Sequence, residues 1–197
     1  MRSTGPLYLA LIMSVVISLL RGINVGGHHK IRMEALRILY ESLGLLGAQT
    51  FLQSGNVIFK TERRDLDLLA RRIEDGIKGS FGFRVDVIVR TPSDLREVIA
   101  RNPFATRPGI DPGRLLVTFL ASNPAAEARD KVLAIKVHPE ELRIDGREIY
   151  TYFPNGMARP KLAWATIEKM LKTSGTGRNW NTVRKLLEIA EIMEVSR

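Results

Sequence analysis

The order of its short apolar runs constrains the fold of this chain more than any other feature. Residues 15–20, 48–53, 56–60 and 85–90 have the apolar or alternating pattern of strands. Apolar side chains at helical spacing predict one helix from Met33 to Leu43 and another from Leu66 to Ile77. Ser54-Gly55 is a hairpin signal between the second and third strands. The order β-α-β-β-α-β is that of the ferredoxin-like split unit.

The rest of the chain predicts a similar series. Thr91-Pro-Ser-Asp94 opens a short helix that reaches Ala100, with Ser93 as its expected N-cap. Further on, we expect a strand at 114–121, a helix at 125–135 and a hairpin of 142–144 with 148–153 across Asp145-Gly146. Helical stripes then begin at Trp164 and Val183. The second half therefore reads β-α-β-β-α, with a helix where a fourth strand would fall.

These elements predict an α+β protein made of two ferredoxin-like βαββα(β) units packed together. Residues 102–113 hold three prolines and two glycines and predict a linker or exposed loop. The expected units are 13–101 and 114–197, the second with an added C-terminal helix. Residues 1–12 are expected to be an N-terminal extension or the product of a misassigned start. The two units should share an extensive interface, because a unit of this size cannot cover its own apolar stripes.

Composition excludes several classes of function. The chain has no cysteine, which rules out disulfides, thiolate nucleophiles and cysteine-bound metals. Its three histidines lack zinc-ligand spacing, so we predict no metal site and no cofactor. The apolar run at 7–20 has 14 residues and is short for a membrane span of ~20. We therefore expect no membrane association and a cytoplasmic location.

The net charge of +9 is concentrated in part of the chain. Between residues 155 and 185 there are seven basic residues and a single acid, Glu168. Such a stretch attracts phosphate-bearing partners, including nucleic acid. Lys161, Lys169 and Lys172 are predicted to share one helix face that could follow a phosphate backbone. The alternative is an ordinary solvated surface.

Two polar, glycine-containing clusters stand where predicted strands end. In a β-α-β-β-α-β unit, the loop after the first strand and the hairpin after the second emerge at the same end of the sheet. Glycine amides, cations and neutral amides together suit an anion. The predicted ligand-binding residues are Arg21, Gly22, Asn24, Gly26, Gly27, Lys30, Gln53, Ser54, Gly55 and Asn56. The alternative is turn chemistry, with glycines at positive φ and amide side chains capping loop backbone.

A third cluster precedes the last predicted helix. Asn179, Asn181 and Thr182 are all competent N-caps, and Trp180 could hold the turn against the core. Arg178, beside the amides that start the helix, would also suit a phosphate. We therefore add Arg178, Asn179, Trp180, Asn181 and Thr182 to the predicted ligand-binding residues.

The runs LLRGINVGG (19–27), QSGNVIF (53–59) and RNWNTV (178–183) resemble, in this order, the family catalogued as domain of unknown function 1697. The resemblance spans about residues 13–191 and implies a two-part α+β fold built on ferredoxin-like units. Members usually begin just before the first strand, which agrees with an extension at 1–12. Members commonly have a second Thr before the Arg, where this chain has Gly177. The family implies no reaction.

Three classes of function stay open at this point. The leading hypothesis is a binding module for a phosphate-bearing ligand, either a nucleotide or a nucleic-acid backbone. The first alternative is an enzyme acting on a small anionic substrate, with Arg21 and backbone amides stabilising charge and His28 or His29 as a base. The second alternative is a protein-interaction module. No catalytic residue is identified, and no oligomeric state is predicted.

Overall fold

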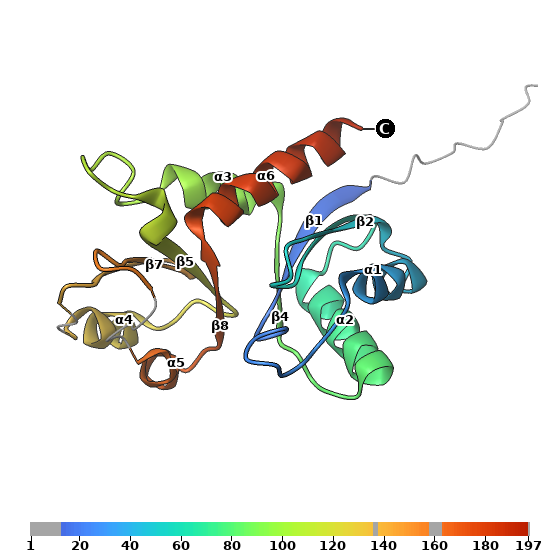
Figure 1. The fold of residues 1–197 in the computed structure, drawn as a ribbon, viewed down its shortest axis with the longest axis horizontal. Coiled ribbons are helices and arrows are strands. Elements are labelled where there is room, and N and C mark those ends of the chain that lie inside the picture. The colour runs from blue at the N-terminus through green and yellow to red at the C-terminus, as the bar shows by residue number, and fades with distance from the viewer. Residues whose placement is uncertain (1–12, 136–137, 158–162, 197) are drawn as a thin grey trace, which may run out of the picture.

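A computed structural model describes residues 13–135, 138–157 and 163–196, so the expected extension at 1–12 lies outside the described residues. The first half forms a four-stranded antiparallel sheet of order β2-β3-β1-β4. Its elements, shown in Figure 1, are β1 (Ser14–Leu20), α1 (Met33–Ser42), β2 (Leu46–Phe51), β3 (Asn56–Thr61), α2 (Leu66–Phe81), β4 (Val87–Arg90) and α3 (Pro92–Ala100).

The second half forms a separate sheet of order β6-β7-β5-β8, again antiparallel throughout. Its elements are a 3-10 turn (Pro112–Arg114), β5 (Leu115–Leu120), α4 (Ala126–Leu133), β6 (Glu141–Asp145), β7 (Glu148–Tyr152), α5 (Trp164–Leu171), β8 (Gly175–Asn179) and α6 (Trp180–Val195). Both strand orders are those of the ferredoxin-like unit. The α+β class and the two ferredoxin-like units predicted from the sequence are confirmed.

The prediction that a helix replaces the fourth strand of the second half was wrong. Residues 175–179 form β8, which pairs with β5. The strand lacks apolar periodicity because glycines stand at 175 and 177, where the partner strand approaches closely. A Cβ atom at Gly175 would lie 2.9 Å from a Thr118 methyl, and one at Gly177 would lie 3.1 Å from Leu116. Close packing selects glycine here and removes the pattern that identifies strands.

Each half therefore ends in the same way, with a fourth strand that runs into a helix. α3 follows β4 and α6 follows β8. The N-cap of α3 is Thr91 and not the predicted Ser93, because Thr91 and Asp94 form a reciprocal capping box. Asn179 caps α6 in the corresponding place, one residue after Arg178, as Thr91 comes one residue after Arg90. The duplication thus extends to the caps of the helices.

Three apolar cores hold the molecule together. α1 and α2 cover the outer face of the first sheet, and α4 and α5 cover that of the second (Figure 1). The inner faces of both sheets share a central core with α3 and α6. Alternate residues of β1 serve different cores: Ile17 and Leu19 enter the central one and Val16 enters the outer one. A strand buried on both faces reads as a continuous apolar run, as 15–20 does.

The segment between α3 and β5 contributes to the central core. Phe104 is buried there beside Tyr152, and the Asn102 side chain accepts a hydrogen bond from the Phe104 amide at 2.9 Å. This segment is therefore not exposed throughout. Within the described ranges, no helix is long and apolar enough to cross a membrane.

Replacing Leu186 on α6 tests whether the two halves unfold as one. Leu186 is fully buried in the central core. Leu186→Ala should lower the free energy of unfolding by about 2–5 kcal/mol because it leaves a cavity in packing that both halves share. Urea denaturation followed by circular dichroism should show a single transition at a lower midpoint. Ile192→Ala, on the exposed side of the same helix, is the control and should change stability by less than about 0.5 kcal/mol. Two separate transitions would contradict a shared core.

Candidate functional site

The end of β1, the β2–β3 hairpin and the start of β4 lie together at one end of the first sheet. The Leu20 amide donates to the Gly55 carbonyl at 2.8 Å, and the Arg21 amide donates to the Asp86 carbonyl at 3.0 Å. The first two polar clusters are therefore neighbours in space, as the strand order requires.

Asn24 fixes the loop that follows β1. Its side-chain amide donates to the carbonyls of Ile31 (3.0 Å) and Gln53 (2.9 Å), and its oxygen accepts from the Ile31 amide (2.9 Å). Its own φ is 57°, and Gly22, Gly26 and Gly27 also have positive φ. The far side of the loop is anchored where the His29 ring stacks on Phe83, with centroids 4.6 Å apart. Asn24 thus shapes the loop and has no amide donor left for a ligand.

Arg21 links the two halves. Its guanidinium donates to Asp86 at 3.1 Å and to Glu168 of α5, in the other half, at 2.7 Å. Glu168 also accepts from the amide of Gly175 at 2.8 Å, so this carboxylate orients both Arg21 and the start of β8. Arg21 is half-exposed and forms an ion pair between the two halves, and the carboxylates of Asp86 and Glu168 balance its charge.

Gly55 and Asn56 are required by packing. A Cβ atom at Gly55 would stand 2.7 Å from both Ile23 and Leu20, and its φ is +74°, so no other residue fits without a shift. Asn56 is fully buried, and its amide group donates to the Phe51 carbonyl (2.7 Å) and the Ser54 hydroxyl (3.0 Å). The Asn56 side-chain oxygen is left facing the second half.

Arg178 of β8 meets that oxygen and joins all three clusters. The side chain is buried, and every N–H donor of its guanidinium finds an acceptor. The acceptors are Asn56 Oδ1 for Nε, Thr176 Oγ1 (2.8 Å) and the Gly177 carbonyl (2.9 Å) for Nη1, and the carbonyls of Leu20 (2.8 Å), Ser54 (3.0 Å) and Gly55 (3.4 Å) for Nη2. Most of these atoms belong to the first half, so Arg178 fastens one half to the other.

No carboxylate within the described ranges lies within ion-pair distance of Arg178. Burial lowers its pKa to about 10, which leaves the guanidinium protonated at neutral pH. Carbonyl and amide dipoles therefore solvate this charge in place of water. With its donors occupied and its surface buried, Arg178 cannot hold a ligand phosphate in this structure, and we remove it from the candidate ligand set.

The remaining members of the third cluster separate. Trp180 packs into the central core. Asn179 caps α6, and its side chain donates to the Gly113 carbonyl at 2.8 Å. Thr182 is half-buried on the first turn of α6, and Asn181 is exposed. Of the three residues predicted as competent N-caps, Asn179 is the one that caps α6.

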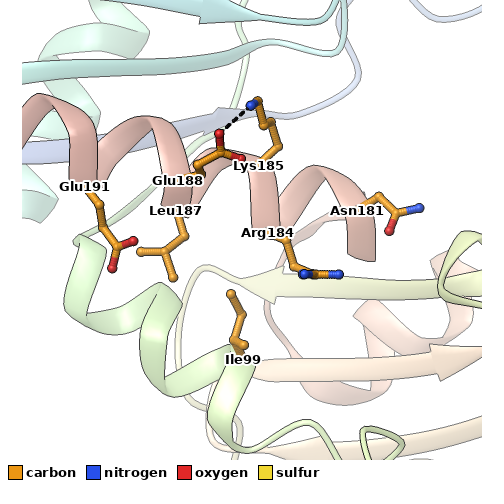
Figure 2. A pocket seen from close by; sticks show the side chains of 7 residues that line it. All are labelled: Ile99, Asn181, Arg184, Lys185, Leu187, Glu188 and Glu191. Carbon is orange, nitrogen blue, oxygen red and sulfur yellow. Dashed lines mark hydrogen bonds and ion pairs between the residues drawn. The ribbon is translucent and has the colours of Figure 1, made fainter.

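Asn181 borders a shallow groove of about 450 Å³ between α6 and α3. Figure 2 shows Asn181 and Arg184 near the start of α6, with Ile99 of α3 across from them. Lys185 donates to Glu188 at 2.7 Å, and Glu191 pairs with Arg96 at 2.9 Å. The lining holds two cations, Arg184 and Lys185, and two acids, Glu188 and Glu191, so the groove has little net charge to attract an anion.

A second cavity, of about 600 Å³, retains the open part of the predicted site. It lies between the loop after β1, the first turn of α1 and the β2–β3 hairpin. Its lining consists of Asn24, Gly27, Lys30, Ile31, Arg32, Met33, Glu34 and Gln53. Four of these, Asn24, Gly27, Lys30 and Gln53, were predicted from the sequence.

The electrostatics of this cavity favour an anion. Neither Lys30 nor Arg32 has a carboxylate within 4 Å in the part of the chain that the structure describes, and both are exposed. α1 begins without a side-chain cap, so its first amides point outward unpaired by any cap residue. Glu34 is the acid in the lining, and it pairs with Arg37 at 3.3 Å. The sequence interpretation missed Arg32, although a cation just before a helix start was visible in the sequence.

Sequence reasoning also missed Arg90, the counterpart of Arg178. Arg90 on β4 is 2% exposed and donates to the Leu120 carbonyl (2.8 Å) and to Glu148 (3.2 Å) in the second half. Arg178 on β8 does the same to Leu20 and Asn56 in the first half. Leu20 and Leu120 end the first strand of each half, and Asn56 and Glu148 begin the third. The two arginines are thus reciprocal ties.

The basic stretch does not form one described surface. Lys161 lies outside the described residues, Lys169 is exposed on α5, and Lys172 follows α5 with φ 53°. Arg178 is buried and unavailable. Because α5 ends at Leu171 and Lys172 is its left-handed C-cap, the prediction that Lys172 shares a helix face with Lys169 was wrong, and the place of Lys161 stays a prediction.

Arg178→Met should destabilise the protein strongly, because Met keeps the volume of the side chain but leaves the carbonyls of Leu20 and Ser54 without their donor. We expect a loss of about 3 kcal/mol in the free energy of unfolding, measured by urea denaturation. Arg184→Met removes an exposed arginine from the next helix and should cost less than about 0.5 kcal/mol. Equal effects of the two substitutions would contradict the role of Arg178 as the tie.

Comparisons with known proteins place the fold. No curated protein matches the chain. Among solved structures, the chain is similar to "conserved bacterial protein SP0830 from Streptococcus pneumoniae", with 21% sequence identity and a TM-score of 0.68. The match covers 91% of this chain and 99% of that one, and it supports the fold alone. Residues 13–150 match the family described as "Protein of unknown function (DUF1697)". The chain therefore belongs to this family.

Proposed function

We propose that the chain is a binding module for a phosphate-bearing ligand, and that the phosphate occupies the cavity between the loop after β1 and the start of α1. The observation that carries the proposal is the pair of exposed cations, Lys30 and Arg32, beside an uncapped helix start. A helix start offers backbone amides and a partial positive charge, and an adjacent Lys and Arg add hydrogen bonds to phosphate oxygens.

The loop is held in shape before a ligand arrives. Asn24 joins the start of the loop to its end at Ile31, and the stack of His29 on Phe83 anchors the returning side of the loop. Gly27 has no heavy atom within 4 Å of its absent Cβ, so the backbone there is accessible. A preformed loop reduces the entropy lost on binding.

The cavity is large enough for more than a phosphate. At about 600 Å³ it falls within the range of small-molecule sites, and Ile31 and Met33 supply an apolar wall. These features support a nucleotide. A nucleic-acid backbone would use the same two cations and extend past the exposed Gln53, so both ligands stay within the proposal.

Binding is better supported than catalysis on this surface. His28 and His29 were considered as bases for an enzyme, but neither lines the cavity. Glu34, the carboxylate in the lining, faces Arg37. An enzyme on a small anionic substrate would need a base that this lining does not provide.

Replacing both cations tests the proposal. Lys30→Gln/Arg32→Gln should weaken binding of a nucleoside triphosphate, measured by isothermal titration calorimetry, by about tenfold or more, because two charge-assisted hydrogen bonds are lost. Arg63→Gln/Arg64→Gln is the matched control: it removes two exposed charges from the loop after β3, at the other end of the sheet. Its affinity should stay near that of the wild type. Equal losses in both variants would show that net charge alone attracts the ligand and would refute the site.

The same pair of variants distinguishes a nucleotide from a nucleic-acid backbone. If the cavity holds a backbone phosphate, a fluorescently labelled oligonucleotide should bind with an affinity that falls steeply with salt. For the oligonucleotide, the slope of log K against log salt should be smaller in magnitude by about two in the Lys30→Gln/Arg32→Gln variant than in the wild type. For a single nucleotide, the slope should be the same in both proteins. Absence of binding to nucleotides and oligonucleotides at low salt would refute the proposed function.

A further inference from the structure

A cavity of about 300 Å³ lies between the two halves on the β4 side. Its walls come from α2 and β4 of the first half and from the end of β5 and the β6–β7 turn of the second. The charged residues in the lining are Asp67, Arg71, Arg90 and Arg147. Arg90 is paired with Glu148, so the lining leaves two cations, Arg71 and Arg147, against one acid.

Because the fold is duplicated, this cavity has an equivalent place on the opposite side of the molecule. On the opposite side of the molecule, the amide of Arg21 bonds the residue before β4, and its guanidinium pairs with Asp86 and Glu168. In the second half, the equivalent amide belongs to Ala121, which bonds Ser174 before β8. The methyl group of Ala121 is too short to reach the other half. The place that the Arg21–Glu168 ion pair fills on one side of the molecule is therefore open on the β4 side.

Arg147 lies on this open side and forms no ion pair within the described ranges. It precedes β7 as Gly55 precedes β3, and its carbonyl accepts from the Leu120 amide as that of Gly55 accepts from Leu20. Arg147 is half-buried, and the described part of the chain places no carboxylate within 4 Å of its guanidinium. The Glu148 carboxylate accepts hydrogen bonds from both Nε and Nη2 of Arg90, each at 3.2 Å.

Arg147 forms no ion pair within the described ranges, although a carboxylate lies near it: burial raises the pKa of Glu148, and Arg90 and, less strongly, Arg147 oppose this rise. Arg90 and Glu148 balance each other, and the proximity of Arg147 contributes to a lowered pKa of Arg90, whose largest cause is burial. Arg71 and Asp67 lie on neighbouring turns of α2, and neither forms an ion pair within the described ranges. An oxyanion between Arg147 and Arg71 would receive hydrogen bonds from both guanidinium groups and relieve their repulsion.

We propose that this interdomain cavity on the β4 side is a second anion site, which binds a phosphate group held by Arg147 and Arg71 across the boundary between the halves. A volume of about 300 Å³ accepts inorganic phosphate or a small phosphate monoester. It is half the volume of the cavity at α1, where we place a nucleotide. The site is independent of the proposed function, because none of its residues lines the cavity at α1.

The test uses the full chain with Lys30→Gln/Arg32→Gln as background, so that binding at the α1 cavity does not contribute. Inorganic phosphate, sulfate and phenyl phosphate are titrated by isothermal titration calorimetry. We expect saturable binding of one equivalent, and a loss of about tenfold or more in affinity when Arg147→Gln is added. Arg143→Gln is the matched control, since Arg143 is an exposed arginine on the same β6–β7 hairpin.

A second variant keeps both arginines and fills the open position. Ala121→Asp places a carboxylate at an exposed position in the lining, where it competes with the ligand for Arg147, and should also abolish phosphate binding. Stronger binding of phenyl phosphate than of phosphate would identify the ligand as a monoester, and equal binding would identify the free ion. The proposal is overturned if no anion binds in the background protein, or if Arg143→Gln weakens binding as much as Arg147→Gln.

Discussion

Arg178 holds a full positive charge inside the protein, and the arrangement of the two halves depends on how that charge is solvated. Its hydrogen bonds reach the end of β1, the β2–β3 hairpin and its own strand. A guanidinium out of water requires all its donors to be satisfied, because each unpaired one costs free energy. This requirement fixes the Asn56 rotamer, the hairpin backbone and the position of β8 together. The three sequence runs that resemble the family are the ones that build this contact.

The second tie, Arg90, repeats the geometry with different chemistry. Arg178 meets the neutral Asn56, whereas Arg90 meets the carboxylate of Glu148. Desolvation raises the pKa of Glu148 even though Arg90 opposes this, so burial outweighs the attraction between Arg90 and Glu148. Two reciprocal ties hold each sheet to the other, and the central core fills the space between them. The halves cannot separate without exposing both guanidinium groups and the apolar inner faces of the sheets.

Most of the fold could be predicted from the sequence, because in elements such as β1, α1 and α2 the spacing of the apolar residues shows which side chains are buried. β8 could not, since Gly175 and Gly177 leave no apolar pattern, and its partner strand explains them only in three dimensions. The convergence of the loop after β1 with the hairpin followed from strand order. The contacts of the Arg178 side chain could not be predicted in this way. An arginine just before a helix start can bind a phosphate or be buried as a contact between the two halves, and the sequence suits both equally well. Only the acceptors supplied by the other half decide between them.

The structure thus divides the polar clusters by what surrounds each cation. Arg21 has two carboxylates that balance its charge, and Arg178 has a shell of neutral acceptors that occupies its donors. Lys30, Arg32 and Arg147 differ, because no described carboxylate lies within 4 Å of their charged groups and each borders a cavity. Glycine marks the turns in both situations and does not separate them. In a duplicated fold the more informative comparison is between equivalent positions. Arg21 joins the halves on one side, whereas its equivalent Ala121 leaves that place open beside Arg147 on the other, where a ligand's charge would be stabilising.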